Sequence, residues 1–226
     1  MNGRIFYIQY IMKNSLTAFA VAGTLAAASL CARAAPVNLS TWTPLGDALV
    51  TPATARLTTA FIDENPISGA LASALDINLL EPSLMAMPGT LGLNAYEGSA
   101  LMQNFVFSGV ATIRFNWTLV TENFNANFAD LAFALVDGSL LLPLANVANT
   151  EVAGLFSYTF GAGNHTLAFG VVDIGDYTGV STLAVSNLDV TTTAVPEPGA
   201  WSLIMLGLGG MGGLSLLSLL RSRRLR

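Results

Sequence analysis

Closely spaced carboxylates are the side chains of this sequence with the clearest potential for chemistry. Asp63 and Glu64 are adjacent, and Asp173 and Asp176 are separated by two residues in a glycine-containing segment. Glycoside hydrolysis requires two carboxyl groups on either side of the scissile bond, and sequence spacing alone does not establish that arrangement. We interpret these acids as solvated loop carboxylates.

Histidine and cysteine each occur once, as His165 and Cys31. Neither stands in a metal-binding HExxH or CxxC motif, and the sequence has no glycine-rich phosphate-binding motif. His165 has no Ser-His-Asp partner nearby in sequence and lies beside a glycine turn, where a structural role is expected. We therefore predict that the protein is not an enzyme. The sequence indicates no cofactor apart from the structural calcium ion considered next.

Four acids suggest a different use of carboxylates. Glu97, Asp173, Asp176 and Asp189 lie in oxygen-rich segments without thiols. Ca²⁺ prefers carboxylate and carbonyl oxygen ligands. If the fold brings these four side chains together, they form a structural calcium site.

Strand alternation over Val110–Thr121 places another set of polar side chains on one surface. Ala111, Ile113, Phe115, Trp117 and Leu119 alternate with polar residues, a pattern typical of a half-buried β-strand. The polar face carries Thr112, Arg114 and Asn116. This face is a candidate glycan-binding surface or, alternatively, only the solvated side of a sheet.

Further strands follow along the chain. Leu131–Val136 and Ser139–Leu142 flank Asp137-Gly138, a dipeptide typical of tight hairpins because both turn positions require positive φ. Their nearly continuous apolar character predicts a strand pair covered on both faces. The sequence from Phe156 to Val171 predicts a second hairpin, with its turn at residues 161–164.

The last predicted strand runs from Thr182 to Val190, and its alternation shifts near Ser186 as at a β-bulge. Earlier in the chain, residues 41–50 and 55–61 predict short strands, and residues 67–75 predict one short helix. Many short strands with glycine turns indicate a mainly β fold, an antiparallel β-sandwich or jelly roll, over residues 35–194.

The charge of this region is strongly negative. Its only basic residues are Arg56 and Arg114. The acidic residues are Asp47, Asp63, Glu64, Asp76, Glu81, Glu97, Glu122, Asp130, Asp137, Glu151, Asp173, Asp176 and Asp189. Because nucleic-acid binding depends on neutralising phosphates with Lys and Arg, this composition excludes a nucleic-acid partner.

The N-terminal segment predicts export. Lys13 precedes the apolar run 16–30, and Ala32-Arg33-Ala34 has small residues at the positions that signal peptidase reads. We interpret residues 1–34 as a signal peptide that uses the Sec translocon and signal peptidase, with Met12 as an alternative start. A retained N-terminal anchor is the alternative.

The C-terminal segment predicts a membrane span. Residues 200–220 are uncharged and mostly apolar, long enough for a helix to cross the bilayer core. Trp201 marks the outer interface, and the basic tail 221–226, with Arg221, Arg223, Arg224 and Arg226, marks the cytoplasmic side. This topology puts residues 35–194 outside the cell membrane, in agreement with the signal peptide.

A short motif precedes this span. Val195, Pro196, Glu197 and Pro198 are followed by the apolar segment, the arginines and the chain end. In this order, residues 195–226 resemble the PEP-CTERM sorting signal. The resemblance implies recognition by exosortase, a membrane-embedded processing enzyme, which removes the tail. The prolines favour an extended chain accessible to a protease, although they could instead only separate a strand from a permanent anchor.

The central region resembles, loosely, the lectin-like or galactose-binding-like sandwich common among PEP-CTERM proteins. The similarity rests on Tyr96–Ala100, the Trp117 strand, Asp130–Gly138 and Ser181–Val190. It departs at Ser186, where such domains often carry an aspartate.

Two functions remain open from the sequence. The sorting resemblance implies a surface or extracellular-matrix protein, structural or adhesive in an exopolysaccharide or biofilm matrix. The alternative is a carbohydrate-binding module presented at the cell surface, with polysaccharide as its partner.

Overall fold

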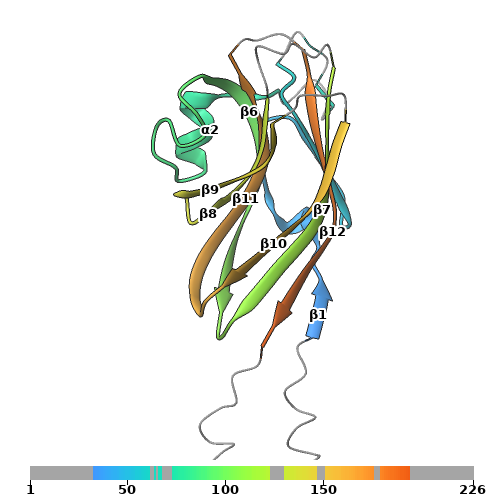
Figure 1. Cartoon of the computed structure of the whole chain (residues 1–226), viewed down its shortest axis with the longest axis vertical. Coiled ribbons are helices and arrows are strands. Elements are labelled where there is room, and N and C mark those ends of the chain that lie inside the picture. Colours follow the sequence, from blue (N-terminus) through green and yellow to red (C-terminus); the bar gives the residue numbers. More distant parts are fainter. Residues whose placement is uncertain are drawn as a thin grey trace, which may run out of the picture. The chain divides into compact units, whose positions relative to one another are not determined.

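The computed structural model describes residues 33–61, 64, 66–67, 73–122, 130–146, 151–175 and 179–193. In this part of the chain, antiparallel strands form two sheets that face each other (Figure 1). The mainly β sandwich predicted from the sequence is confirmed. Of the predicted signal peptide, residues 1–34, only residues 33 and 34 are described, and the predicted membrane helix, residues 200–220, lies outside the described residues. Among the described residues, no helix is long and apolar enough to cross a membrane.

Sheet A has the strand order β10-β7-β12-β4-β3, and β1 pairs with β12 beside β4. The bounds of its strands are β1 Arg33–Pro36, β3 Ala48–Val50, β4 Thr54–Thr58, β7 Ala111–Thr121, β10 Glu151–Phe160 and β12 Ser181–Thr192.

Sheet B has the order β2-β6-β11-β8-β9, and β5 pairs with β6. The bounds of its strands are β2 Thr43–Leu45, β5 Leu75–Asp76, β6 Ala95–Phe107, β8 Leu131–Val136, β9 Leu140–Asn146 and β11 Gly163–Ile174. A 3-10 turn at Leu39–Thr41 and the helix α2, Ile77–Ser83, complete the described elements.

Aromatic rings fill the space between the sheets. Phe115 of sheet A stacks on Phe156 at a centroid distance of 4.6 Å and meets Phe169 of sheet B at 5.1 Å. Both Phe115 and Phe169 are fully buried. The strict alternation of β7 follows from this arrangement, since every second side chain must enter the core while its neighbours face solvent.

A second apolar layer covers part of the outer face of sheet B. Leu80 and Leu84 of the α2 segment, with Leu91 after it, pack on Phe133 of β8 and Ala168 of β11. All six residues of β8 are therefore buried, as predicted for a strand covered on both faces. Its partner β9 is instead an edge strand with exposed residues, so the prediction of a doubly covered pair is wrong for β9.

The second predicted hairpin is also wrong. β10 pairs with β7 in sheet A, whereas β11 pairs with β6 and β8 in sheet B. The turn after Phe160 therefore crosses from one sheet to the other instead of closing a hairpin. Phe156 of β10 and Phe169 of β11 both point into the core between the sheets. Both strands therefore show the same alternation, although they belong to different sheets.

The short helix lies later than predicted. Residues 68–72 are outside the described part, and Leu75 belongs to β5. The helix α2 begins at Ile77, where the Asp76 side chain accepts a hydrogen bond of 2.8 Å from the backbone N–H of Asn78. An aspartate N-cap of this kind satisfies one of the free N–H groups of the first turn.

The first and last strands of the sandwich, β1 and β12, pair with each other. Arg33 pairs with Thr192, so the first strand begins beside the end of the last (Figure 1). The predicted cleavage after Ala34 falls inside β1. Cleavage there would leave Ala35 and Pro36 as the paired residues of the strand.

Candidate functional site

The polar residues predicted on β7 all point away from the core. Arg114 and Asn116 are exposed and Thr112 is half-buried, while Ile113, Phe115 and Trp117 between them are buried. The alternation of the sequence therefore predicted the orientation of this face.

Neighbouring strands extend the polar surface on both sides of β7. Thr112 lies opposite Thr159 of β10 and Thr191 of β12, and Arg114 lies opposite Ser157 and Asp189. We call this surface the Arg114 face. Its residues are Thr112, Arg114 and Asn116 of β7, Leu155, Ser157 and Thr159 of β10, and Ser186, Asp189 and Thr191 of β12.

Arg114 is weakly engaged at the centre of this face. Its Nε donates to Ser157 Oγ at the long distance of 3.4 Å. Asp189 is its cross-strand neighbour, yet no hydrogen bond or ion pair joins the side chains of these two described residues. The guanidinium and the carboxylate of Asp189 are thus adjacent groups with most of their hydrogen-bonding capacity left.

A bulge in β12 gives Asp189 this position. The register against β7 shifts between Ser186 and Asp189, and Asn187 adopts a positive φ of 53°. Leu188 enters the core, and Asp189 then returns to the outer face beside Arg114. The bulge predicted near Ser186 is confirmed, and it turns the Asp189 side chain toward the outer face, as bulges often do.

The other arginine of the region lies on the same side of the sandwich. Arg56 of β4 is exposed and lies opposite Ala184 of β12, which in turn lies opposite Thr118 of β7. Both basic residues found between residues 35 and 194 therefore project from sheet A.

The four acids of the calcium hypothesis do not all converge. Glu97 of β6 and Asp173 of β11 are buried on adjacent strands of sheet B. Asp189 projects from the outer face of sheet A, so it cannot join them, and Asp176 lies outside the described residues. Among the residues described, no three histidine, cysteine or acidic side chains form a metal-binding group.

His165 makes an interaction that sequence spacing did not reveal. Its Nδ1 lies 3.0 Å from Oδ2 of Asp137, and Oδ1 of Asp137 accepts from the Thr166 N–H at 2.8 Å. The imidazole ring also packs near Phe160 and Phe107. Burial raises the pKa of Asp137, but the hydrogen bonds from His165 and Thr166 outweigh it and lower the pKa below 3.8.

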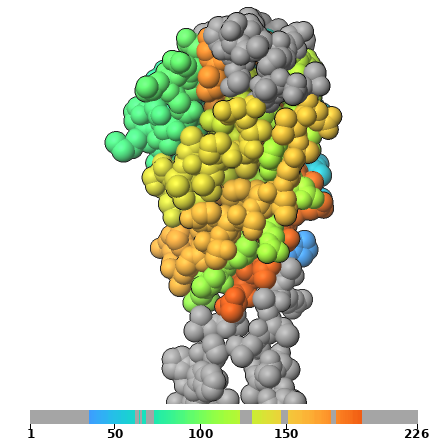
Figure 2. All heavy atoms as spheres, in the orientation of Figure 1, coloured from blue at the N-terminus to red at the C-terminus, as the bar shows by residue number. Residues whose placement is uncertain are grey.

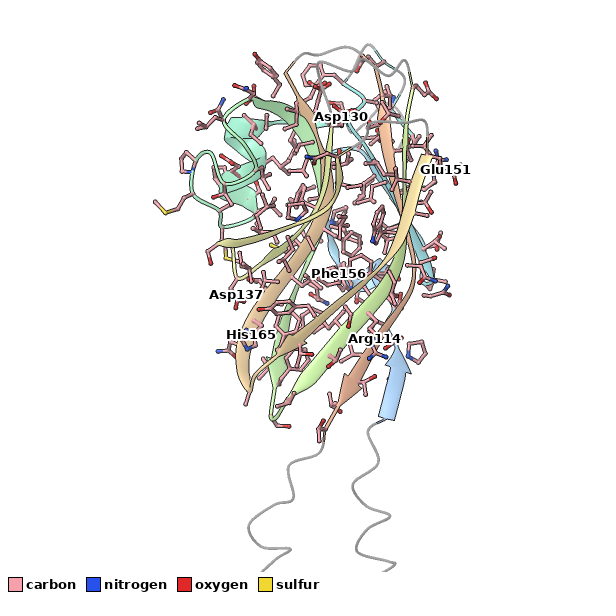
Figure 3. All side chains as sticks on the ribbon, viewed as in Figure 1. Arg114, Asp130, Asp137, Glu151, Phe156 and His165 are labelled. Carbon is pink, nitrogen blue, oxygen red and sulfur yellow. The ribbon has the colours of Figure 1, made fainter. Side chains whose placement is uncertain are left out.

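The Asp137–His165 pair borders a groove that the sequence analysis did not predict. The groove has a volume of about 500 Å³ and lies over β6 and β11, between the Asp137-Gly138 turn and the loop after α2. Figure 3 shows Asp137 and His165 on one side of the sandwich and Arg114 on the other. No local signal could have found this groove, because four separate stretches of chain supply its lining.

The sorting motif and topology residues predicted from the sequence lie outside the described part of the chain. These are Val195, Pro196, Glu197, Pro198, Trp201, Arg221, Arg223, Arg224 and Arg226.

Comparison with known proteins finds similarity only at the level of structure. No family model and no curated protein match the sequence. A CBM4 structure is 12% identical with a TM-score of 0.33, over 68% of this chain and 96% of that one. The mannan-binding module of Man5C is 16% identical with a TM-score of 0.31, over 72% and 99% of the two chains.

A family 35 carbohydrate-binding module from Clostridium thermocellum is 11% identical with a TM-score of 0.32, over 70% of this chain and 97% of that one. Identities and TM-scores at this level are too low to assign this chain to any of these families or to give it their ligands.

Proposed function

We propose that this protein is a non-catalytic surface protein that is exported and binds polysaccharide through the Arg114 face. The observation that carries the proposal is the adjacency of Arg114 and Asp189 on an exposed sheet surface, with only one long hydrogen bond from the guanidinium to Ser157. A strong donor and a strong acceptor stand side by side and remain open to a ligand.

The chemistry of the face suits sugar hydroxyl groups. Each sugar hydroxyl both donates and accepts, so it can bind a guanidinium N–H and a carboxylate oxygen at neighbouring positions. Hydroxyl side chains surround the pair, including Ser157, Thr159 and Thr191. Thr112 and Thr159 already form a hydrogen bond of 2.9 Å to each other, which holds two of these groups in place.

The sequence supports the cellular part of the proposal. The signal peptide would deliver the chain through the Sec translocon, and exosortase would recognise Val195–Pro198 and remove the membrane tail. The sandwich would then reside at the cell surface or in an exopolysaccharide or biofilm matrix.

Polysaccharide pull-down with the exported protein tests the binding function. We expect Arg114→Ala to weaken binding by about tenfold or more, because hydrogen bonds to a charged group contribute about 1.5–3 kcal/mol. Arg56→Ala is the matched control, since it removes the same charge from the same sheet outside the Arg114 face. Equal loss of polysaccharide binding in both variants would show that positive charge on sheet A, and not the Arg114 face, is responsible. No loss of binding in either variant would exclude the Arg114 face as the site.

Sorting is tested by the mass of the exported protein. Processing predicts a surface form that lacks the basic tail, and substitution of Pro196, Glu197 and Pro198 by alanine should leave the tail attached in the membrane fraction. A wild-type surface protein that retains Arg221–Arg226 would exclude processing.

Structural calcium remains part of the proposal only through Glu97 and Asp173. If Ca²⁺ binds the folded chain, the melting temperature should rise in calcium relative to chelator, because a ligand of the folded state stabilises it. Glu97→Gln should remove that difference, whereas Asp189→Asn should preserve it. Identical melting temperatures in calcium and chelator would exclude the ion.

A further inference from the structure

The groove on sheet B has the composition of a small-molecule site. Its lining includes Met85 from the loop after α2, Asn104 and Val106 of β6, Asp137 of the β8–β9 turn, and Asn164 and Thr166 of β11. Ligand sites are typically concave, mostly apolar, and supplied with a few fixed polar groups. A volume of about 500 Å³ lies within the ordinary range of such sites.

Four of these side chains form two cross-strand pairs on one face of the sheet, and we call this group of four the tile. Asn104 lies directly opposite Thr166, and Val106 lies directly opposite Asn164. Residues opposite each other in an antiparallel pair share one face, with Cβ atoms about 5 Å apart. The two amides therefore occupy diagonal corners of the tile, with the threonine hydroxyl and the valine methyl groups at the others.

The polar groups of the tile are available to a ligand. Within the described part of the chain, neither amide side chain makes a hydrogen bond to another residue, and both asparagines are exposed. Asp137 is 44% exposed, and its two oxygens still have lone pairs beyond the bonds from His165 and Thr166. The site thus offers amide donors and acceptors together with one carboxylate.

Apolar side chains border this polar tile. Val106 is 81% exposed and Met85 is 58% exposed, so both side chains can offer apolar surface to a ligand. The loop that carries Met85 lies close against the Asp137-Gly138 turn. Met85 adopts a positive φ of 57°, and its carbonyl oxygen lies only 2.5 Å from where a Cβ on Gly138 would stand. A side chain at Gly138 would displace the loop that carries Met85.

The charge of the groove selects among ligands. Asp137 remains ionised at neutral pH because its pKa is lowered. No lysine or arginine is among the lining residues, and the one histidine there, His165, is already paired with Asp137, so an anionic ligand would meet a carboxylate and no unengaged cation. A metal ion is also a poor occupant, because one carboxylate does not make the oxygen-rich shell of a divalent cation.

From this geometry we propose that the groove is a second carbohydrate site, specific for a neutral pyranose unit. The C–H face of the ring packs against Met85 and Val106, and its hydroxyls bind the amides of Asn104 and Asn164 and the carboxylate of Asp137. The site lies on the opposite sheet from the Arg114 face and does not depend on it.

Nuclear magnetic resonance of the side-chain amides tests this site directly. The probes are neutral cello-, manno- and galacto-oligosaccharides, with a galacturonate oligosaccharide as the anionic comparison. We expect at least one neutral probe to shift the Asn104 and Asn164 amide resonances in a saturable manner, and the galacturonate probe to leave them unshifted. Equal shifts by neutral and anionic probes would contradict the charge argument.

Variants then separate the two surfaces. Asn164→Ala and Val106→Glu, both at exposed positions, should weaken binding of the neutral probe by about tenfold, and Arg114→Ala should leave it unchanged. If Arg114→Ala abolishes binding of the neutral probe and Asn164→Ala does not, the groove is excluded while the Arg114 face stands. If no neutral probe shifts either amide, the groove is excluded whatever the pull-down shows.

Discussion

Asp137 combines two tasks at one position. It occupies the first place of the β8–β9 turn with a positive φ of 51°, and its carboxylate holds both the His165 ring and the Thr166 N–H. The same residue therefore closes a hairpin of sheet B and ties that hairpin to the start of β11. A substitution at Asp137 should report on stability as well as on ligand binding.

The lowered pKa of Asp137 makes its contribution pH-dependent. A carboxyl whose pKa is lower in the folded chain stabilises the fold above its unfolded value, near 3.8, and this stabilisation disappears as the pH falls through the folded value. Asp137→Asn should therefore lower the free energy of unfolding at neutral pH by up to about 1 kcal/mol, as expected for a partly exposed pair. At pH about 3 the loss should shrink.

Urea unfolding of wild type and variant at both pH values measures this effect. Glu151→Gln is a suitable control, because Glu151 is an exposed carboxylate of β10. The same loss for Asp137→Asn at both pH values would show that turn geometry, not ionisation, is responsible.

At the scale of elements, Glu81 shows how the apolar layer over the outer face of sheet B is held in place. Its buried carboxylate accepts 2.8 Å hydrogen bonds from the backbone N–H groups of Gly89 and Leu91. These bonds fold the loop after α2 back onto the helix and place Leu91 over the sheet. The loop includes Met85, so the same carboxylate helps to shape one wall of the groove.

Removal of this carboxylate should loosen that apolar layer. We expect Glu81→Ala to lower the free energy of unfolding by about 2–4 kcal/mol, because two backbone donors lose their partner and one of them is buried. Denaturant unfolding gives the number, and Glu151→Ala serves as the exposed control. A cost as small as the control's would mean that water replaces both bonds.

The elements that the sequence predicted best are those whose pattern is local. β7 follows from pure alternation, and the β8–β9 turn follows from two adjacent residues that both need positive φ. β6 gave no such signal, because Gly98–Leu101 is buried on both faces and does not alternate. The pairing of β10 and β11 was mispredicted because alternation tells which face is buried but not which strand lies alongside.

The residues of the candidate sites were likewise predictable where they share one strand and unpredictable where they come from separate strands. Thr112, Arg114 and Asn116 share one strand, so the sequence placed them on one surface. Their partners Ser157 and Asp189 come from strands that only the sheet order brings to β7. The groove combines residues near positions 85, 105, 137 and 165, and no spacing rule connects such distant segments.

For the whole molecule, the two proposed sites lie on opposite sheets. Figure 2 shows one side of the sandwich, with the α2 segment in green beside the β8–β9 hairpin in yellow and β11 in orange. A protein with one binding surface on each sheet can hold two polysaccharide chains at once. Two modest affinities then combine into strong retention through multivalency.

Simultaneous binding of two polysaccharide chains by one protein, here called bridging, gives a further prediction. Wild-type protein should increase the light scattering of a soluble neutral polysaccharide that it binds, with a maximum at an intermediate protein concentration. Arg114→Ala and Asn164→Ala should each abolish the increase while one site still binds. If either single variant still aggregates the polymer as wild type does, bridging through these two surfaces is wrong.

The position of β12 has a mechanical consequence. This strand pairs with β7 along one edge and with β4 and then β1 along the other, so it is hydrogen-bonded on both sides up to its end at Thr192. Ladder hydrogen bonds run across the strands, and tension applied along β12 from Thr193 must shear many of them together instead of unzipping them one at a time. If the chain is held at Thr193, a pull on the sandwich along β12 would thus load this ladder in its most resistant direction.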